Sequence, residues 1–264
     1  MAETTLYQFT GSDLTPVTWC QPGEEAVVAA DSWRVVDGNV IGLSSHLERF
    51  RRSVAAVAPE ESGRVDGFIE AAVNAIPDSG EWFPRVECVA TPHGHLFRFY
   101  HRDAPERLAT AILATASHDP RTQPLVKGPD LDALMALRKE VAPTGATEAV
   151  ILTPDGYIAE GAYSSVIVWP PGLAEMWVVR EGIPRIPSVT EQEVADSARS
   201  ERIPVTGKKM LPEKLDDHVV WVVSALHGIR EATSWVGGPP LASATEMAKA
   251  WNERLLTRRV PLRP

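Results

Sequence analysis

The sequence predicts a mixed α+β or α/β protein made of two domains. Its 264 residues are enough for one large domain or two of ordinary size. Short β-like runs alternate with helical patterns along the whole chain, and a polar segment with two prolines, "SHDPRTQP", interrupts them. We therefore expect a smaller N-terminal α/β domain over residues 1–116, a linker over 117–124 and a larger C-terminal α/β domain over 125–264.

The N-terminal elements follow from turn residues and apolar periodicity. The run "EAVVAADSWRVVDGNVIGL" predicts a strand and then a hairpin turned by Asp37-Gly38, a dipeptide typical of two-residue turns. A helix is expected over 44–57, because its apolar residues fall on one face and Ser44 or Ser45 can cap it. The other elements expected before the linker are a helix over 68–76, a strand pair around 92–94 and a strand over 109–116.

After the linker the same signals predict a second alternating series. The run "PLVK" should end a short strand at Lys127, a helix should follow over 130–141, and strands over 148–153 and 157–169 should meet at a turn. The remaining expected elements are strands over 175–180, 203–210 and 218–225, a short helix over 212–217, and helices over 187–201 and 241–258.

Composition excludes several function classes. A net charge of −9 and a pI near 5.3 disfavour binding to nucleic acid or an anionic membrane, and no apolar run reaches membrane-spanning length. Two cysteines without a CxxC pattern are too few for a disulfide framework or a four-thiolate metal site. The start "MAETTLYQFT" lacks the features of a signal peptide. We expect a cytoplasmic protein with no metal, nucleic-acid or membrane partner.

One set of polar residues is suited to a particular cofactor. Lys127 and Glu160 are 160 − 127 = 33 residues apart, separated by a helix and a hairpin that would return the chain beside its start. Arg49 lies upstream, and "SVTE" at Ser188–Glu191 is a capping box that opens a helix. An amine, a carboxylate, an arginine and a helix N-terminus together fit pyridoxal 5′-phosphate (PLP), which needs a Schiff-base amine, a partner for its ring nitrogen and phosphate donors. Each residue alone also has a structural interpretation as a strand-end lysine, an edge-strand charge, an exposed helix charge or an ordinary cap.

The order of these residues resembles the class IV aminotransferases, over about residues 27–235. "SSHLERFRRSV" is similar to the helix whose arginine binds the cofactor phosphate, which implies Arg49. "VKGPDL" resembles the segment with the Schiff-base lysine, which implies Lys127. "DGYIAEGAYSSVIVW" resembles the stretch whose glutamate meets the ring nitrogen, which implies Glu160 and, beside it, Ser164 and Ser165. The resemblance implies a two-domain fold-type IV enzyme, similar to D-amino acid aminotransferase, that works as a homodimer.

Two further segments resemble the phosphate-binding loops of this family. "RIPSVTEQ" implies contacts from Ser188, Val189 and Thr190, and "VVSALHGIREATSW" implies contacts from Ser224 and Ala225. The chain departs from the family pattern where Ser165 replaces an asparagine, Ser188 a glycine and Glu191 an arginine.

The resemblance implies a PLP-dependent transaminase acting on a small amino acid or related amine, with Lys127 as the catalytic residue. One alternative is a 4-amino-4-deoxychorismate lyase, which would release pyruvate and 4-aminobenzoate; the interval of 33 residues is also expected of that branch. A second alternative is a non-catalytic relative that keeps the fold for binding. Arg98 and Arg102 in "LFRFYHRD" alternate with aromatic residues, and both are candidates to hold a substrate carboxylate or to be plain surface charges.

Overall fold

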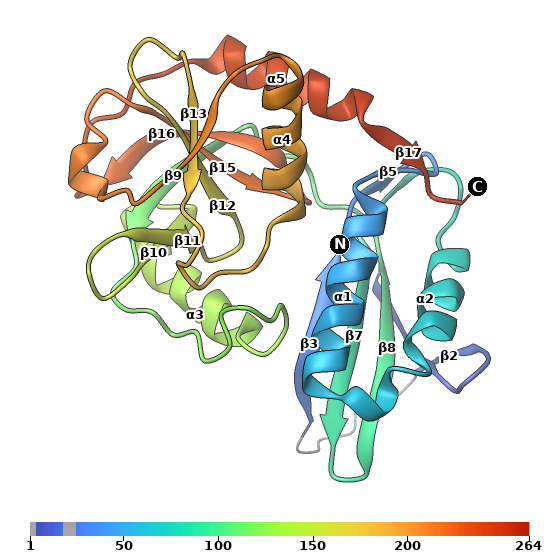
Figure 1. Cartoon of the computed structure of the whole chain (residues 1–264). Helices are drawn as coiled ribbons and strands as arrows, with labels where there is room; N and C mark the ends of the chain where they lie inside the picture. The colour runs from blue at the N-terminus through green and yellow to red at the C-terminus, as the bar shows by residue number, and fades with distance from the viewer. Residues whose placement is uncertain (1–3, 18–24, 264) are drawn as a thin grey trace. The chain divides into compact units, whose positions relative to one another are not determined.

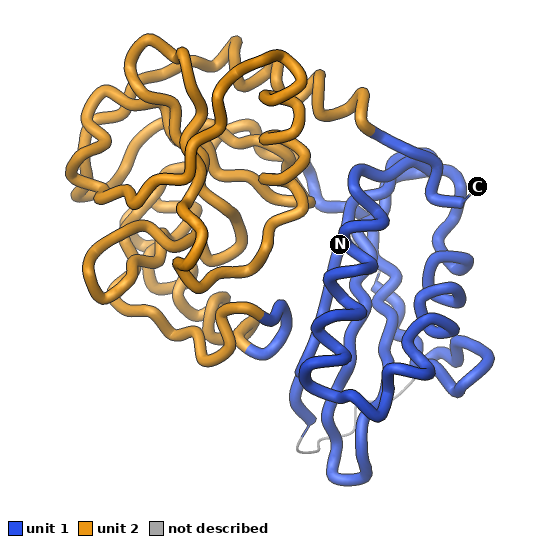
Figure 2. The backbone as a smooth tube through the Cα atoms, viewed as in Figure 1, with its two compact units in different colours: residues 1–106, 126–129, 259–264 blue, residues 107–125, 130–258 orange. Residues whose placement is uncertain are grey.

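The computed structural model describes residues 4–17 and 25–263 of the chain. The chain divides into two compact units (Figure 2). Unit 1 contains residues 1–106, 126–129 and 259–264, and unit 2 contains residues 107–125 and 130–258. Within the described ranges, no helix combines the length and the apolarity that are needed to cross a bilayer.

The division differs from the domain limits that the sequence predicts, 1–116, 117–124 and 125–264. The chain enters unit 2 already at Arg107, because the strand β9 (Thr110–Thr115) is hydrogen-bonded on both sides inside the unit 2 sheet. Residues 117–125 stay in unit 2. Val126–Pro129 belongs to unit 1, and so does the end of the chain, where β17 (Arg259–Pro261) pairs with β5 (Asn39–Ile41).

Unit 1 is built on a five-stranded antiparallel sheet with the order β2-β1-β8-β7-β3 (Figure 1). Its strands are β1 (Thr4–Phe9), β2 (Leu14–Pro16), β3 (Ala26–Ser32), β7 (Arg85–Thr91) and β8 (Gly94–Arg102). A small sheet of order β17-β5-β4-β6 adds β4 (Val35–Val36) and β6 (Glu81–Trp82). The helical elements are α1 (Leu43–Val57), the 3₁₀ turn η1 (Pro59–Glu61) and α2 (Val65–Asn74).

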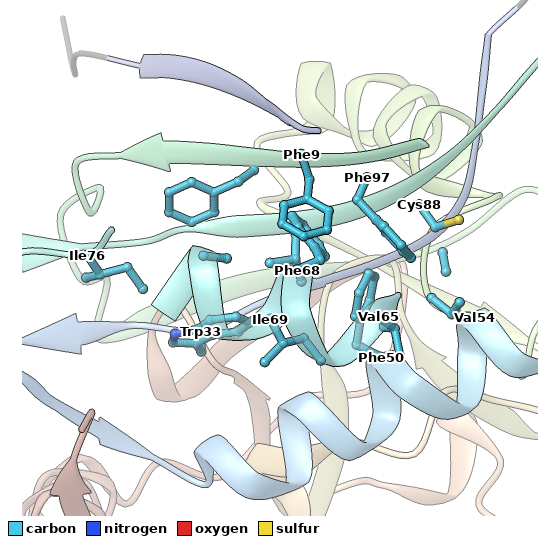
Figure 3. Packing of buried hydrophobic residues seen from close by; sticks show 14 of the residues in the cluster. Phe9, Trp33, Phe50, Val54, Val65, Phe68, Ile69, Ile76, Cys88 and Phe97 are labelled. Carbon is cyan, nitrogen blue, oxygen red and sulfur yellow. The ribbon is translucent and has the colours of Figure 1, made fainter. Parts of the chain in front are cut away.

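The core of unit 1 lies where α1 and α2 cover one face of the five-stranded sheet (Figure 3). Phe68 of α2 stacks on Phe97 of β8 with ring centroids 4.8 Å apart, and Phe50 of α1 packs against both rings. Cys88 of β7 is buried in the same cluster, and burial raises the pKa of its thiol to about 12. This thiol is therefore part of the packing and is neutral at physiological pH.

The start of unit 1 contains the predicted hairpin but a different helix cap. Asp37 and Gly38 have φ of 46° and 67° and join β4 to β5 as the predicted two-residue turn. Helix α1 begins at Leu43, and its N-cap is Gly42 in the left-handed region with no side-chain cap. Ser44 and Ser45 therefore lie inside the first turn, so the predicted serine cap is wrong.

Unit 2 is built on an eight-stranded mixed sheet with the order β11-β10-β9-β16-β15-β12-β13-β14. Besides β9 its strands are β10 (Glu148–Leu152), β11 (Ile158–Gly161), β12 (Ser165–Trp169), β13 (Met176–Val179), β14 (Val205–Lys208), β15 (Val219–Ser224) and β16 (Gly228–Val236). Its helical elements are α3 (Leu131–Val141), α4 (Val189–Ser200), α5 (Thr245–Thr257) and the 3₁₀ turns η2 (Ala142–Thr144) and η3 (Pro212–Lys214). The sheet curls so far that its first strand, β11, also lies against β12 and β13 (Figure 1).

Two predicted strands of unit 2 differ from the structure. The single strand expected over 157–169 is broken at residues 162–164, where the chain turns from β11 to β12, so these strands lie in different parts of the curled sheet. The segment "PLVK" has no strand pairing and consists of turns and bends, because Val126–Pro129 leaves unit 2 and packs on β3 of unit 1.

The segment Val126–Pro129 approaches β3 backbone to backbone. The amide N–H of Ala30 donates to the carbonyl of Lys127 at 2.6 Å. Gly128 has φ of +139°, and a Cβ atom there would come within 2.8 Å of the backbone of Ala29 and of Ala30. Only glycine therefore allows this contact, and this explains the glycine directly after Lys127 in "VKGPDL".

We predict that Gly128→Ala destabilises unit 1 more than an alanine placed at a glycine with a similar backbone but open surroundings. Gly94, with φ of +115° and no atom within 4 Å of its added Cβ, is that control. The backbone strain should cost roughly 1–3 kcal/mol of unfolding free energy in both variants. The clash should add about 1–3 kcal/mol at Gly128 alone. Urea unfolding of both variants measures the difference, and equal losses would contradict the close contact.

Candidate active site

Lys127 is held in unit 1 beside a buried charged cluster. Its carbonyl is fixed by Ala30, the residue before Asp31 on β3. Its ammonium charge lies close enough to His46 to contribute to lowering the pKa of that imidazole. The side chain is partly buried. The predicted Schiff-base lysine therefore lies next to the helix that carries Arg49.

Arg49 is locked in place by Asp31, a residue that the sequence analysis did not assign to the site. The guanidinium of Arg49 donates from Nε to Oδ2 of Asp31 at 2.7 Å and from Nη2 to Oδ1 at 2.8 Å. Nδ1 of His46 lies 2.8 Å from the same Oδ1. Asp31 is fully buried; burial raises its pKa, but the charge of Arg49 and the hydrogen bonds from His46 and Arg49 outweigh that effect and hold the pKa below its usual range. Asp31 thus provides a fixed anion that orients the predicted phosphate-binding arginine.

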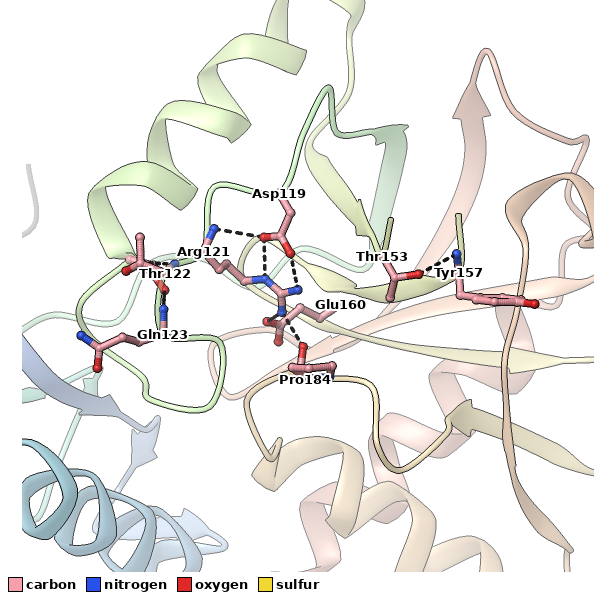
Figure 4. A network of polar contacts seen from close by, with 9 residues as sticks. Asp119, Arg121, Thr122, Gln123, Thr153, Tyr157, Glu160 and Pro184 are labelled. Atoms are coloured by element: carbon pink, nitrogen blue, oxygen red, sulfur yellow. Dashed lines mark hydrogen bonds and ion pairs between the residues drawn. The ribbon is translucent and has the colours of Figure 1, made fainter. Parts of the chain in front are cut away.

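Glu160 is held in unit 2 by a second arginine (Figure 4). It lies on β11 opposite Ile151 of β10 and is 5% exposed. Nη1 of Arg121 donates to Oε1 of Glu160 at 2.6 Å and to the carbonyl of Pro184 at 3.0 Å. The same guanidinium donates from Nε and Nη2 to the two oxygens of Asp119, each at 2.8 Å. Asp119 and Arg121 fall in the stretch that the sequence predicts to be a linker.

The charges in this group are mutually stabilised. Burial lowers the pKa of Arg121, but its bonds to Asp119 and the charge of Glu160 outweigh burial and raise the pKa above its ordinary value. Burial raises the pKa of Asp119, yet the bonds from Arg121 hold it below its usual range. The guanidinium of Arg121 is thus held between two carboxylates, those of Asp119 and Glu160.

The start of α4 follows half of the predicted capping box. Ser188 is the N-cap, and its Oγ accepts a hydrogen bond from the Glu191 amide at 3.2 Å. The carboxylate of Glu191 is bonded instead to Nη2 of Arg185 at 2.6 Å. Burial raises the pKa of Glu191 against the opposing effect of Arg185. Val189 and Thr190 form the first turn and are buried. Arg185 thus pairs with the charge of Glu191, the residue that stands where the resemblance implies an arginine.

The four predicted residues at Ser164, Ser165, Ser224 and Ala225 have different surroundings. Ser164 Oγ donates to Oε2 of Glu148 at 3.0 Å, and that oxygen also accepts from Arg230 at 2.8 Å, so this hydroxyl belongs to a buried network. Ser165 opens β12 opposite Val223 of β15, which places it beside the end of the strand where Ser224 and Ala225 lie. Ser224 Oγ accepts from the His227 amide at 3.3 Å.

The two arginines predicted to bind a substrate carboxylate both have protein partners in unit 1. Nη2 of Arg98 donates to both oxygens of Glu25, at 2.8 and 2.7 Å. Arg102 donates from Nε to the carbonyl of Phe83 at 2.9 Å and lies over the Phe83 ring. Burial, together with the charge of Arg85, lowers the pKa of Arg102 to about 10. A role for either arginine in binding substrate stays a prediction.

Comparison with known proteins identifies the family. A family model described as amino-transferase class IV matches residues 29–235, which is more than half of the chain and includes Arg49, Lys127 and Glu160. This chain belongs to the class IV aminotransferases. They are PLP-dependent enzymes, so PLP is the cofactor of this chain. No curated protein matches the sequence significantly.

Solved structures of class IV aminotransferases have the same fold at low sequence identity. A fold IV-transaminase from Curtobacterium pusillum is 18% identical, with a TM-score of 0.76 over 97% of this chain and 98% of the other. The PLP form of a branched-chain amino acid aminotransferase from Thermobaculum terrenum is 16% identical, with a TM-score of 0.78 over 98% of each chain. A PLP-bound hypothetical aminotransferase from Mycobacterium tuberculosis is 15% identical, with a TM-score of 0.75 over 97% of this chain and 98% of the other. The fold-type IV prediction is therefore confirmed.

The residues of this class IV aminotransferase fit PLP chemically. Lys127 offers a primary amine, which an aldehyde requires. Glu160 is a buried carboxylate with a guanidinium partner, which suits a protonated ring nitrogen. The N-terminus of α4 and the preorganised Arg49 suit a phosphate.

The Asp31–His46–Arg49 cluster predicts a loss of stability in mild acid. Burial, together with the charges of Arg49 and Lys127, lowers the pKa of His46 in spite of Asp31. The unfolded chain therefore binds a proton at this imidazole below about pH 6.5, and the folded chain binds it less readily. A depressed histidine pKa in the folded state means that stability falls as pH falls. Between pH 7 and 5 the loss from His46 should reach up to about 2 kcal/mol of unfolding free energy.

His46→Asn should flatten this pH dependence, as measured by urea unfolding of the cofactor-free protein at several pH values. His95→Asn, which removes a histidine of unit 1 that is paired with Glu60, is the matched control and should retain the wild-type slope. A slope that is unchanged in His46→Asn would contradict the buried neutral imidazole.

Proposed function

We propose that this class IV aminotransferase is a transaminase that moves the amino group of a small amino acid or related amine to an oxo acid. The observation that supports this most is the buried Glu160 carboxylate held by Arg121 at 2.6 Å. A carboxylate in contact with a guanidinium is an acceptor only, so it suits a ring nitrogen that carries a proton.

PLP, when bound, withdraws electrons from the substrate carbon that bears the amino group. In our proposal Lys127 would hold the cofactor covalently through its amine, and the free amine would take up the proton of that carbon. Glu160 accepts the hydrogen bond of the ring N–H. Arg49 and the amide groups of Val189 and Thr190 would bind the phosphate, and the Thr190 hydroxyl would add a further donor.

Two further parts of the proposal concern contacts around the cofactor. Ser165 begins β12 opposite Val223, and Ser224 and Ala225 follow Val223 at the end of β15, a position suited to contacts with a second side of the phosphate. Arg98 and Arg102 on β8 are the candidates for the substrate carboxylate, and their present partners, Glu25 and the Phe83 carbonyl, would have to share them.

A lyase is the second candidate function, favoured by the interval of 33 residues between Lys127 and Glu160. The same residues would serve a 4-amino-4-deoxychorismate lyase, because both reactions begin with removal of a proton from the carbon next to the amine. The products separate the two functions. A transaminase converts an amino acid to its oxo acid and leaves the amino group on the cofactor, whereas the lyase releases pyruvate and 4-aminobenzoate and leaves the cofactor unchanged.

We predict that borohydride reduction of the PLP-loaded wild type attaches the cofactor to Lys127, as found by peptide mass spectrometry. Lys127→Ala should lose this label and fall at least about 10³-fold in kcat, because the covalent bond and the base are removed together. Lys139→Ala, which removes an exposed lysine of α3, is the control and should behave as the wild type.

The loaded wild type should then be incubated with a series of small amino acids and with aminodeoxychorismate. Oxo-acid formation supports the transaminase, and pyruvate with 4-aminobenzoate supports the lyase. A wild type that binds no PLP, or that is labelled equally in Lys127→Ala, would contradict the catalytic proposal and favour the non-catalytic relative.

A further inference from the structure

We propose that Arg121 is a positioning residue of this active site: it fixes Glu160 as an ionised acceptor for the cofactor ring nitrogen and ties it to the loop that precedes α4. This inference rests on the proposed function, in which Glu160 meets that nitrogen. Nothing in the sequence motifs assigns a role to Arg121, which lies in a segment expected to be a linker.

The geometry of Arg121 is that of a built site (Figure 4). Its side chain is only 4% exposed although it lies in an irregular segment. Each of its three guanidinium nitrogens donates a hydrogen bond. Nε and Nη2 donate to Asp119, and Nη1 donates to Glu160 and to the carbonyl of Pro184. A buried guanidinium that makes these four hydrogen bonds cannot change direction without leaving a carboxylate unpaired.

The segment that carries Arg121 is anchored from the other side as well. Asp130, the residue before α3, accepts hydrogen bonds from the amide and hydroxyl of Thr122 and from the amide of Gln123, at 2.7–3.0 Å. These bonds hold the backbone directly after Arg121. The arginine is therefore presented to Glu160 by a loop whose backbone is hydrogen-bonded in place, which is the support that an accurately placed side chain needs.

The charge of Arg121 has a direct consequence for Glu160. A carboxylate that is almost completely buried is unstable as an anion unless a cation accompanies it. Without Arg121, Glu160 would tend to take up a proton, and it would then donate to an unprotonated ring nitrogen. In the presence of Arg121 the proton stays on the ring, where it is needed to withdraw electrons.

The contact with Pro184 gives Arg121 a second role in the same site. Pro184 lies four residues before Ser188, the N-cap of α4, which is the predicted phosphate-binding turn. One guanidinium therefore links the predicted ring-nitrogen partner to the loop that leads into the predicted phosphate site. Its removal should weaken PLP binding as well as change the protonation of the ring.

The experiment compares wild type and Arg121→Gln, both loaded with PLP labelled with ¹⁵N in the ring. The ¹⁵N chemical shift reports directly whether the ring nitrogen is protonated. We expect a protonated nitrogen in the wild type and a shift toward the unprotonated form in Arg121→Gln. The Kd for PLP should rise about 10-fold or more, and kcat should fall about 10- to 100-fold with a smaller change in KM, by analogy with the loss found when the hydrogen-bond partner of a metal-binding residue is removed.

Arg258→Gln is the matched control, because it removes another arginine–glutamate pair of unit 2, to Glu193, and should keep the wild-type shift and Kd. A folded Arg121→Gln protein with a fully protonated ring nitrogen and an unchanged Kd would overturn the inference. If Arg121→Gln does not fold, Arg121→Lys decides, since lysine keeps the charge but cannot reach all four acceptors: a kcat at least 10-fold lower supports the role, and a wild-type kcat overturns it. A wild type without PLP on Lys127 would overturn the proposed function and this inference together, whereas a normal wild type with an unaffected variant would overturn only the inference.

Discussion

The arrangement depends on the rule that a buried charge must be paired. Two buried arginines are paired with buried carboxylates, Arg49 with Asp31 in unit 1 and Arg121 with Glu160 in unit 2, and Arg121 is also paired with the partly exposed Asp119. Removing one partner of such a pair costs about 3–5 kcal/mol, because the other charge is left uncompensated. The same pairs hold Arg49 and Glu160, the predicted partners of the cofactor phosphate and ring nitrogen, in fixed positions. Charge pairing therefore contributes both to the stability of the fold and to the preorganisation of the site.

Backbone packing imposes the second constraint. Lys127 lies in a short segment, Val126–Pro129, that is not part of any strand. The carbonyl of Lys127 is fixed by Ala30, and Gly128 permits the contact because a side chain there would collide with β3. The same strand supplies Asp31. Lys127 and Arg49 of α1 are thus both bonded to residues of β3 in unit 1. This explains how an irregular segment can carry a residue that must be placed accurately.

Local sequence signals predicted those features that depend on neighbours along the chain. Residues that are close in the sequence are enough to predict the helix at Ser188, the hairpin at Asp37-Gly38 and the strand with Glu160. Arg121 could not be found in this way, because its partner Glu160 is 39 residues away and its own segment has the polar, proline-containing composition of a linker. Asp31 could not be found for the same reason, because its partner Arg49 is distant in the sequence. The boundary between the units differs from the predicted one because β9 pairs with β10 and β16, which lie far along the chain.

We propose that Lys127 and Glu160 serve one cofactor through its two ends, the aldehyde carbon and the ring nitrogen. The most direct measurement is a crystal structure of the protein after loading with PLP and reduction. The account predicts continuous electron density from Nζ of Lys127 to the cofactor, with the ring nitrogen within hydrogen-bond distance of a Glu160 carboxylate that is still bonded to Arg121. A cofactor attached to another lysine, or a ring nitrogen that faces a group other than Glu160, would contradict it.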